Sequence, residues 1–353
     1  MKKSLIALAA VAASGAAFAQ SSVTVFGIVD AAVTVYDGKD TVSGLGNSGN
    51  SSSRLGFRGV EDLGNGLKAQ FWLEGAIAND DGTGAGGGAT GPGFEFKRRS
   101  TISLLSNYGE LRLGRSTTAA YDAVSRYDNF GTVGVGASRV WSTGGYDVRR
   151  SNMLGYYSND FSGFKFALNY AFGEQTAGAR DGSYLGGSAT YDNGPLSVGF
   201  GAEKFRRSSV AGVTPVADDI TAYGLGASYN FGVVKLAGAY LNQENKVLGG
   251  AKVDRDHFLL ALSAPVGAAG EAKLSYNRYN QDVAGGTDLK ADQFALGYVH
   301  NLSKRTAVYG TYAFLKNKNN GSGFTLGGAG LTLPAVDAGG KIQAFQVGVR
   351  HAF

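Results

Sequence analysis

Arginine recurs in this chain at spacings that a β-strand would place on one face. Arg54 and Arg58 are four residues apart, so in a strand they share a face and lie about 13 Å apart at ~3.3 Å per residue. Because Leu55 and Phe57 occupy the opposite face, the two arginines are expected to point to water. A guanidinium stays charged at any working pH, and its planar fork matches carboxylate or phosphate. The chemistry that suits this face is therefore the binding of anions.

Two further clusters contain adjacent basic residues. One is Arg98 with Arg99, after Lys97, and the other is Arg149 with Arg150. Neighbouring residues of a strand face opposite sides, so at least one arginine of each pair can enter the same space in either register. The pattern leaves open which arginine of each pair does so.

Residues that could catalyse a reaction or hold a metal are few and scattered. The chain has no cysteine, which excludes disulfides, thiolate metal sites and cysteine nucleophiles. Its 3 histidines, His257, His300 and His351, lie in separate segments without metal-ligand spacing, and we expect His257 to be solvated at a strand start. The sequence GLGNSG at 44–49 matches a dinucleotide pattern but leads into a strand, not a helix. We predict no catalytic residue, no cofactor and no metal site.

The composition narrows the class of protein that must position the arginines. Glycine accounts for 56 of 353 residues, proline for 5, and charged residues for 17% of the chain. Proline is too scarce for collagen, and aromatic and β-branched residues are too frequent for a disordered chain. The formal charge of +5 is spread over many segments, so we expect no nucleic-acid partner.

The first 19 residues have the pattern of a signal peptide. Lys2 and Lys3 precede an apolar stretch, and the sequence AFA at 17–19 fits a cleavage site. We predict that residues 1–19 are removed and that residues 20–353 form a single domain outside the cytoplasm.

Beyond this leader, apolar and polar residues alternate with a period of two. The segments LKAQFWLE at 67–74 and TAYGLGASY at 221–229 are examples, and in the second the minor face is mostly glycine and alanine. No stretch has the ~20 consecutive apolar residues of a membrane-spanning helix. About sixteen alternating segments can be counted. They begin near Val23, Ser52, Leu67, Lys97, Glu110, Arg149, Phe164, Ser183, Leu196, Ile220, Val233, Val253, Ala272, Asp292, Arg305 and Lys341.

The connections between these segments alternate between short and long. Short turns, rich in residues that tolerate positive φ, are predicted at 61–66, 159–163, 192–195, 230–232 and 300–304. Longer links are predicted at 37–50, 79–94, 116–146, 207–218, 281–290 and 317–340. Strands of ~9–11 residues with short turns at one rim and long loops at the other are typical of outer-membrane barrels.

Hydrogen bonding explains why such strands must close into a cylinder. A sheet in hydrocarbon cannot leave an edge unpaired, since each orphan backbone group costs several kcal/mol. We therefore predict a transmembrane antiparallel β-barrel of 16 strands, with short periplasmic turns and long extracellular loops. Aromatic pairs are expected in girdles at the membrane surfaces. These pairs are Tyr156 and Tyr157, Phe161 and Phe164, Tyr229 and Phe231, and Tyr309 and Tyr312.

Several motifs also resemble those of the trimeric general-diffusion porins of Gram-negative bacteria. They are SRLGFRGVEDLGNGLKA at 53–69, GELRLGR at 109–115, YVHNLSKRT at 298–306 and VGVRHAF at 347–353. The resemblance runs from residue 20 to residue 353, with the motifs in the right order. It implies a homotrimer in the outer membrane, passive passage of ions and small hydrophilic solutes, contact with lipid and lipopolysaccharide, and a C-terminal assembly signal at Phe353.

The resemblance further implies that the link 116–146 folds into the lumen as a constriction loop. Arg54, Arg58 and one of Arg98 or Arg99 would then form a basic wall opposite the loop, with Arg149 or Arg150 nearby. In and beside the loop, the charged candidates are Arg115, Asp122, Arg126, Asp128 and Arg139. The chain lacks the Pro-Glu-Phe-Gly-Gly segment that enteric porins carry there.

With so few acids facing the arginines, we expect weak to moderate anion selectivity. Two alternatives remain open from the sequence. The arginines could only solvate the wall or pair with Glu61, Asp62 and Glu74. The protein could also be a structural or adhesive barrel whose lumen is closed.

Overall fold

The computed structural model describes residues 22–84, 93–139, 148–174, 182–206, 217–247, 252–319, 321, 323–328 and 330–353. The predicted signal peptide and its cleavage site lie outside these residues.

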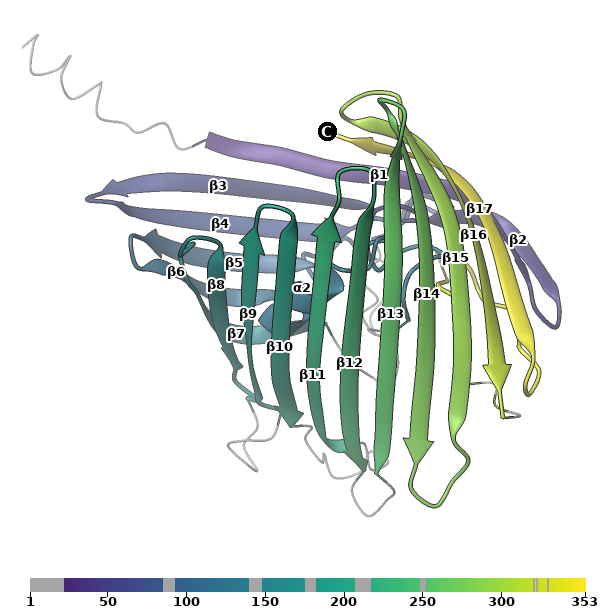
Figure 1. Cartoon of the computed structure of the whole chain (residues 1–353). Coiled ribbons are helices and arrows are strands. Elements are labelled where there is room, and N and C mark those ends of the chain that lie inside the picture. Colours follow the sequence, from purple (N-terminus) through teal and green to yellow (C-terminus); the bar gives the residue numbers. More distant parts are fainter. Residues whose placement is uncertain are drawn as a thin grey trace, which may run out of the picture.

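The described chain forms one closed, antiparallel sheet, with a short helix inside the ring of strands (Figure 1). The strands are β1 Ser22–Asp37, β2 Thr41–Asn47, β3 Arg54–Gly64, β4 Leu67–Ala76, β5 Arg99–Ser106, β6 Gly109–Thr117, β7 Arg149–Tyr157, β8 Phe164–Ala171, β9 Tyr184–Asn193, β10 Leu196–Arg206, β11 Ala217–Asn230, β12 Lys235–Val247, β13 Val253–Val266, β14 Gly270–Val283, β15 Leu289–Asn301, β16 Thr306–Lys318 and β17 Lys341–Ala352. Apart from β2 and β3, which both pair with β1, each strand pairs with its neighbour in sequence, and β1 closes the cylinder by pairing with β17.

Strands β2 and β3 share one place in the cylinder. β2 pairs with residues 31–37 of β1, and β3 pairs with residues 22–28 of the same edge. The 17 strands therefore fill 16 positions, which confirms the predicted barrel. The prediction of a long link at 37–50 was wrong, because β2 continues the second strand through it. The link predicted at 281–290 is also shorter, since β14 extends to Val283 and β15 begins at Leu289.

The strand register separates an outer apolar face from an inner polar one. In β1, the odd-numbered Val23 and Val33 are 62% and 60% exposed on the outside, whereas Asp30, Thr34 and Tyr36 face inward and are buried. Directly paired residues of antiparallel strands lie on the same side of a sheet. Arg54 pairs with Ile28 and Arg58 with Thr24, so both arginines are on the inner face, as predicted.

The short turns lie where the alternation predicted them. The β3–β4 turn has positive φ at Asn65 and Gly66, and the turns after β9 and β11 have positive φ at Gly194 and Gly232. These backbone conformations are the ones that glycine and asparagine adopt at least cost.

The link after β6 folds into the lumen through the helix α2, Ala119–Ser125. Thr118 caps this helix by accepting a hydrogen bond from the backbone N–H of Tyr121, and α2 packs against strands β8 to β11. Glycines on the inner faces of β10 and β11 make the approach possible. A side chain at Gly201 would overlap Ala120, and one at Gly226 would overlap the ring of Tyr127.

A second segment, residues 323–328, also turns inward. The buried ring of Phe324 stacks on Tyr279 at 5.3 Å, and Asn317 exchanges two hydrogen bonds with the Phe324 backbone. The phenol of Tyr36 donates to the carbonyl of Gly327 at 2.6 Å. The sequence analysis expected only one inward loop. Phe324 also packs edge-on against His257, which is buried, so the expected solvated position of His257 was wrong.

The aromatic girdle prediction is partly wrong. Phe161, Phe231 and Tyr312 are exposed on the outside, but Tyr309 is buried on the inner face and Tyr157 contacts Arg112 within the lumen. Among the described residues, no helix has the length and apolar character needed to cross a membrane.

Candidate functional site

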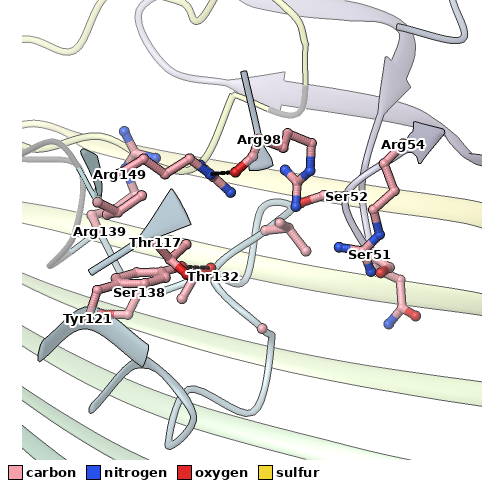
Figure 2. Close-up of a pocket in the computed structure, with 14 residues that line it drawn as sticks. Ser51, Ser52, Arg54, Arg98, Thr117, Tyr121, Thr132, Ser138, Arg139 and Arg149 are labelled. Atoms are coloured by element: carbon pink, nitrogen blue, oxygen red, sulfur yellow. Dashed lines mark hydrogen bonds between the residues drawn. The ribbon is translucent and has the colours of Figure 1, made fainter. Parts of the chain in front are cut away.

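The lumen contains a cavity of about 460 Å³, here called the arginine cavity. Figure 2 shows arginines from the barrel wall facing the inward loop across it. Its described lining is Asn50, Ser51, Ser52, Arg54, Arg98, Thr117, Tyr121, Gly131, Thr132, Val133, Ser138, Arg139, Val148 and Arg149. Four of these residues are arginines, and none is acidic.

Glu74, a buried residue of β4, contacts two of these arginines, Arg54 and Arg98. Its Oε1 accepts from Nε of Arg98 at 2.7 Å and lies 3.8 Å from Nη1 of Arg54. Its Oε2 accepts from the indole N–H of Trp72 at 3.2 Å. The carboxylate therefore compensates part of the charge of two guanidinium groups while fixing where they point.

The other two arginines approach from the start of β7 and from the loop. Nε of Arg149 donates to the backbone carbonyl of Arg98 at 3.1 Å, which links the two sides of the wall (Figure 2). The backbone N–H of Arg139 donates to the phenol oxygen of Tyr279 at 2.9 Å. Burial lowers the pKa of the Arg139 side chain, while the nearby phenol groups of Tyr279 and Tyr36 raise it. The loop thus adds a cation opposite the wall.

The structure shows where both arginines of each adjacent pair lie. Arg98 precedes β5 and turns toward Glu74, while Arg99 begins β5 and places its guanidinium 4.5 Å from the ring of Trp72. Both side chains therefore face the lumen. Alternation failed to separate them because Arg98 lies outside the regular strand. In the second pair, Arg149 lines the arginine cavity and Arg150 packs 3.8 Å from the ring of Phe205.

Arg58 lies on the expected face but outside the arginine cavity. Its guanidinium is 5.3 Å from the rings of both Phe26 and Trp72. Four residues of strand separate it from Arg54, which is enough to move it toward the short-turn rim.

Neither acid of the inward loop lines the arginine cavity. Asp128 is buried, and its carboxylate accepts backbone N–H bonds from Phe130 at 3.0 Å, Thr132 at 3.2 Å and Ser138 at 2.9 Å. Burial raises the pKa of Asp128, and these three hydrogen bonds lower it. The Asp128 carboxylate therefore stabilises the backbone of the inward loop. Asp122 accepts from Thr117 at 2.8 Å and faces a different cavity.

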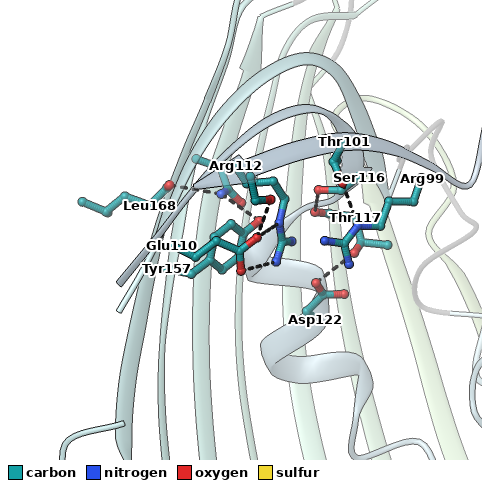
Figure 3. Close-up of polar contacts among 11 residues, drawn as sticks. Arg99, Thr101, Glu110, Arg112, Ser116, Thr117, Asp122, Tyr157 and Leu168 are labelled. Carbon is teal, nitrogen blue, oxygen red and sulfur yellow. Dashed lines mark hydrogen bonds and ion pairs between the residues drawn. The ribbon is translucent and has the colours of Figure 1, made fainter. Parts of the chain in front are cut away.

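That second cavity, of about 370 Å³, is here called the turn-side cavity because Ser158 and Lys165 of its lining flank the short turn at 159–163. Figure 3 shows part of it, with Arg99 and Arg112 beside α2. It also contains the predicted residue Arg126. Arg112 and Lys165 were not among the predicted site residues, and Tyr157 was predicted only as a girdle aromatic.

Three of the four cations in the described lining of the turn-side cavity have acidic partners. Arg112 makes a two-point contact with Glu110 at 2.8 and 2.9 Å and lies 3.9 Å from the ring of Tyr157. Arg126 pairs with Asp192 at 2.8 Å, and Lys165 with Asp160 at 3.0 Å. The described lining of the arginine cavity, by contrast, has four arginines and no acid.

Arg115 and Phe353 also lie outside both cavities. Arg115 donates to the carbonyl of Lys97 at 2.7 Å and to the hydroxyl of Ser151 at 3.0 Å, which ties β6 to its neighbours. Phe353 exchanges two backbone hydrogen bonds with Gly27 at 3.1 Å, at the seam where the barrel closes.

Neither Glu74 nor Asp30 was among the site residues predicted from the sequence. Glu74 appeared only as a possible partner of the arginines, and Asp30 was not considered. A carboxylate on the inner face of an otherwise apolar strand, as in FGIVDAAV at 26–33, was the available signal for Asp30.

Comparison with known proteins places the chain among porins. A family model described as Gram-negative porin matches residues 5–320. The chain is 50% identical to outer membrane porin protein 32 of Delftia acidovorans and 31% identical to an outer membrane porin protein of Bordetella pertussis, in both cases over 100% of each chain. The solved structure of an anion-selective porin from Comamonas acidovorans matches with a TM-score of 0.83 and 45% identity, covering 95% of this chain and 100% of that one.

Proposed function

The chain belongs to the Gram-negative porin family, and from this premise we propose that it forms a water-filled channel through the outer membrane that favours small hydrophilic anions. Solutes cross by passive diffusion, so no bond is made or broken. The observation that carries the preference is the arginine cavity, with four arginines and no acid among its described lining residues.

Electrostatics gives the direction and the approximate size of the preference. A unit charge about 4 Å from an anion contributes about 1 kcal/mol in water, and more where the dielectric constant is lower. Glu74 compensates part of the charge of Arg54 and Arg98. The remaining excess raises the concentration of anions at the narrow level and repels cations. Because water fills the lumen, the preference is moderate and not absolute.

The polar lining suits anions that exchange part of their hydration shell. Ser51, Ser52 and Thr132 offer hydroxyls beside the guanidinium groups. Chloride, phosphate and small carboxylates are the solute class that such a lining accepts. The name of the Comamonas relative, an anion-selective porin 45% identical to this chain, supports the same class.

We further propose that three copies associate through the outer face of β1. Val23, Val25, Val29 and Val33 form a row of exposed apolar side chains there. A second barrel could cover this row, although lipid would also satisfy it.

The test is the reversal potential of the purified protein in a planar bilayer under a salt gradient. We expect a potential of the sign that anion permeability produces. A variant with Arg54, Arg98, Arg139 and Arg149 all replaced by alanine should lose most of it. A clear cation preference of the wild type would reject the proposal. Silent bilayers from folded protein would favour the closed-lumen alternative.

A further inference from the structure

The second strand position of the barrel contains a six-residue interruption, residues 48–53, between β2 and β3. Asn47 pairs with Ala31 and Arg54 pairs with Ile28, so these six residues lie opposite only Val29 and Asp30. The four surplus residues leave the ladder, and the interruption presents Ser51 and Ser52 to the arginine cavity.

One carboxylate organises this interruption. Asp30, 0% exposed, accepts backbone N–H bonds from Gly49 at 3.2 Å, Asn50 at 2.9 Å and Ser51 at 2.6 Å. Three consecutive backbone N–H groups directed at one anion form a concave nest, which needs a negative charge at its centre. The buried phenol of Tyr309 adds a fourth bond to Asp30 at 2.5 Å.

The backbone of Asp30 fixes the two ends of the interruption as well. Its carbonyl accepts from the N–H of Ser48 at 2.9 Å and from the side-chain amide of Asn79 at 2.8 Å. Its N–H donates to the hydroxyl of Ser53 at 3.0 Å.

The interruption in turn supports both sides of the arginine cavity. Arg54 follows it directly and begins β3. The tip of the inward loop rests against it, because a side chain at Gly134 would overlap the carbonyl oxygen of Gly49. Asn50 is also held from the far side by Nη1 of Arg350 at 3.2 Å. A movement of the interruption would therefore displace a wall arginine and the loop together.

We propose that Asp30 is the positioning residue of the pore, which holds residues 48–53 inward so that Arg54 and the loop tip bound a cavity of fixed width. Asp30 itself does not line the cavity. The proposal rests on the proposed channel function, because it concerns the geometry through which anions pass.

A positioning role and a purely electrostatic role of Asp30 predict opposite changes in the preference for anions when Asp30 is replaced. If Asp30 acted only through its charge, replacing it would remove a negative charge from the lumen and increase the preference for anions. If Asp30 is a positioning residue, replacing it should decrease the preference for anions. Its loss leaves buried N–H groups without an acceptor, so the interruption relaxes and the arginines disperse.

The experiment compares Asp30→Ala with Asp37→Asn in planar bilayers. Asp37 lies on the same strand, is exposed, and loses the same charge on substitution. For Asp30→Ala we expect the anion-to-cation permeability ratio to fall about twofold, since part of the arginine field is lost, and the open-channel current noise to rise. Asp37→Asn should leave both unchanged. An unchanged or increased ratio with wild-type noise in Asp30→Ala would overturn the proposal.

Tyr309→Phe provides a second variant if Asp30→Ala fails to fold. It removes one bond to Asp30 without changing the charge, so we expect a smaller change in the same direction. Tyr312→Phe on the same strand is its control, because the Tyr312 hydroxyl bonds Gln343 on the outer rim. Wild-type noise and selectivity in Tyr309→Phe would contradict the positioning role.

A thiol probe separates this proposal from the proposed function. The chain has no cysteine, so Ser52→Cys introduces a single reactive group into the cavity lining. We expect a neutral methanethiosulfonate reagent to modify this thiol at a rate that changes severalfold when Asp30→Ala is added, because the interruption moves. An unchanged rate would reject the role of Asp30, whatever the ion preference of the wild type.

Discussion

At the scale of single residues, position along a strand decides which arginines can act on a passing ion. Arg54 lines the arginine cavity, whereas Arg58, on the same face, lies against Phe26 and Trp72. From the sequence the two arginines were expected to be equivalent, because residues four apart in a strand lie on the same face. It cannot show that the inward loop crosses the lumen at the level of only one of them.

Arg54→Ala and Arg58→Ala should therefore differ in effect. We expect Arg54→Ala to lower the anion-to-cation permeability ratio by roughly two- to fivefold, corresponding to the loss of about 0.5–1 kcal/mol of attraction. Arg58→Ala, which removes the same charge from the same strand, should change the ratio much less. Reversal potentials of the two variants provide the measurement. Equal losses would mean that the field of the whole lumen, and not the cavity, sets the preference.

Glu74 shows why counting charges was insufficient. The alternative that the arginines pair with nearby acids is correct for Arg54 and Arg98, which both approach Glu74. Pairing and pore lining are nevertheless compatible, since one carboxylate between two guanidinium groups leaves a net positive charge at the cavity.

At the scale of elements, the glycine-rich inner face of β11 is the receptor for the inward loop. The ring of Tyr127 occupies the space that a side chain at Gly226 would fill. The outer residues Tyr223 and Leu225 remain exposed and apolar. The same strand thus supports the barrel on one face and accepts the loop on the other.

Gly226→Ala should displace the loop while the barrel still forms. Overpacking of this kind costs about 1–3 kcal/mol, and here the ring of Tyr127 must move because the added carbon would lie only 2.0 Å from its nearest atom. We expect an altered single-channel conductance with a normal yield of folded protein. Gly238→Ala on β12 is the control, since its added carbon would have only one neighbour, at 3.5 Å. Identical conductance in both variants would contradict this packing account.

Most strands and short turns could be predicted from the sequence, because the alternation of apolar and polar residues depends only on local residue type. Alternation gave the strand starts, the turn at Asn65 and Gly66, and the inner face of Arg54. It did not predict β2, because residues 48–53 separate β2 from β3. Asp30 of β1 stabilises this interruption. Nor did it predict the inward turn at Phe324, which depends on stacking with Tyr279 from β14. Both depend on contacts between residues distant in sequence.

At the scale of the whole molecule, the two lumen cavities divide the charge unevenly. In the turn-side cavity Arg112 and Arg126 have acidic partners, whereas the described lining of the arginine cavity has four arginines and no acid. An ion crossing the barrel would therefore meet a selective level and a nearly balanced one in series.

A single selective level exposed to water should be sensitive to salt. The Debye length falls from about 10 Å at 0.1 M to about 3 Å at 1 M, so concentrated salt screens all but the nearest arginine. We expect the anion-to-cation permeability ratio to decrease steadily over this range at a constant gradient. Reversal potentials at several mean concentrations would measure it. A ratio independent of salt would point instead to direct, dehydrated coordination of the ion.

The pairing of β1 with β17 carries a consequence for biogenesis. The first described strand pairs with β17, and Phe353 adds two backbone hydrogen bonds to Gly27. A nascent polypeptide that lacks its C-terminus therefore retains two open edges, which cannot be left bare in hydrocarbon. Until β17 pairs with β1, the edges of the sheet would therefore need to be covered by something other than lipid.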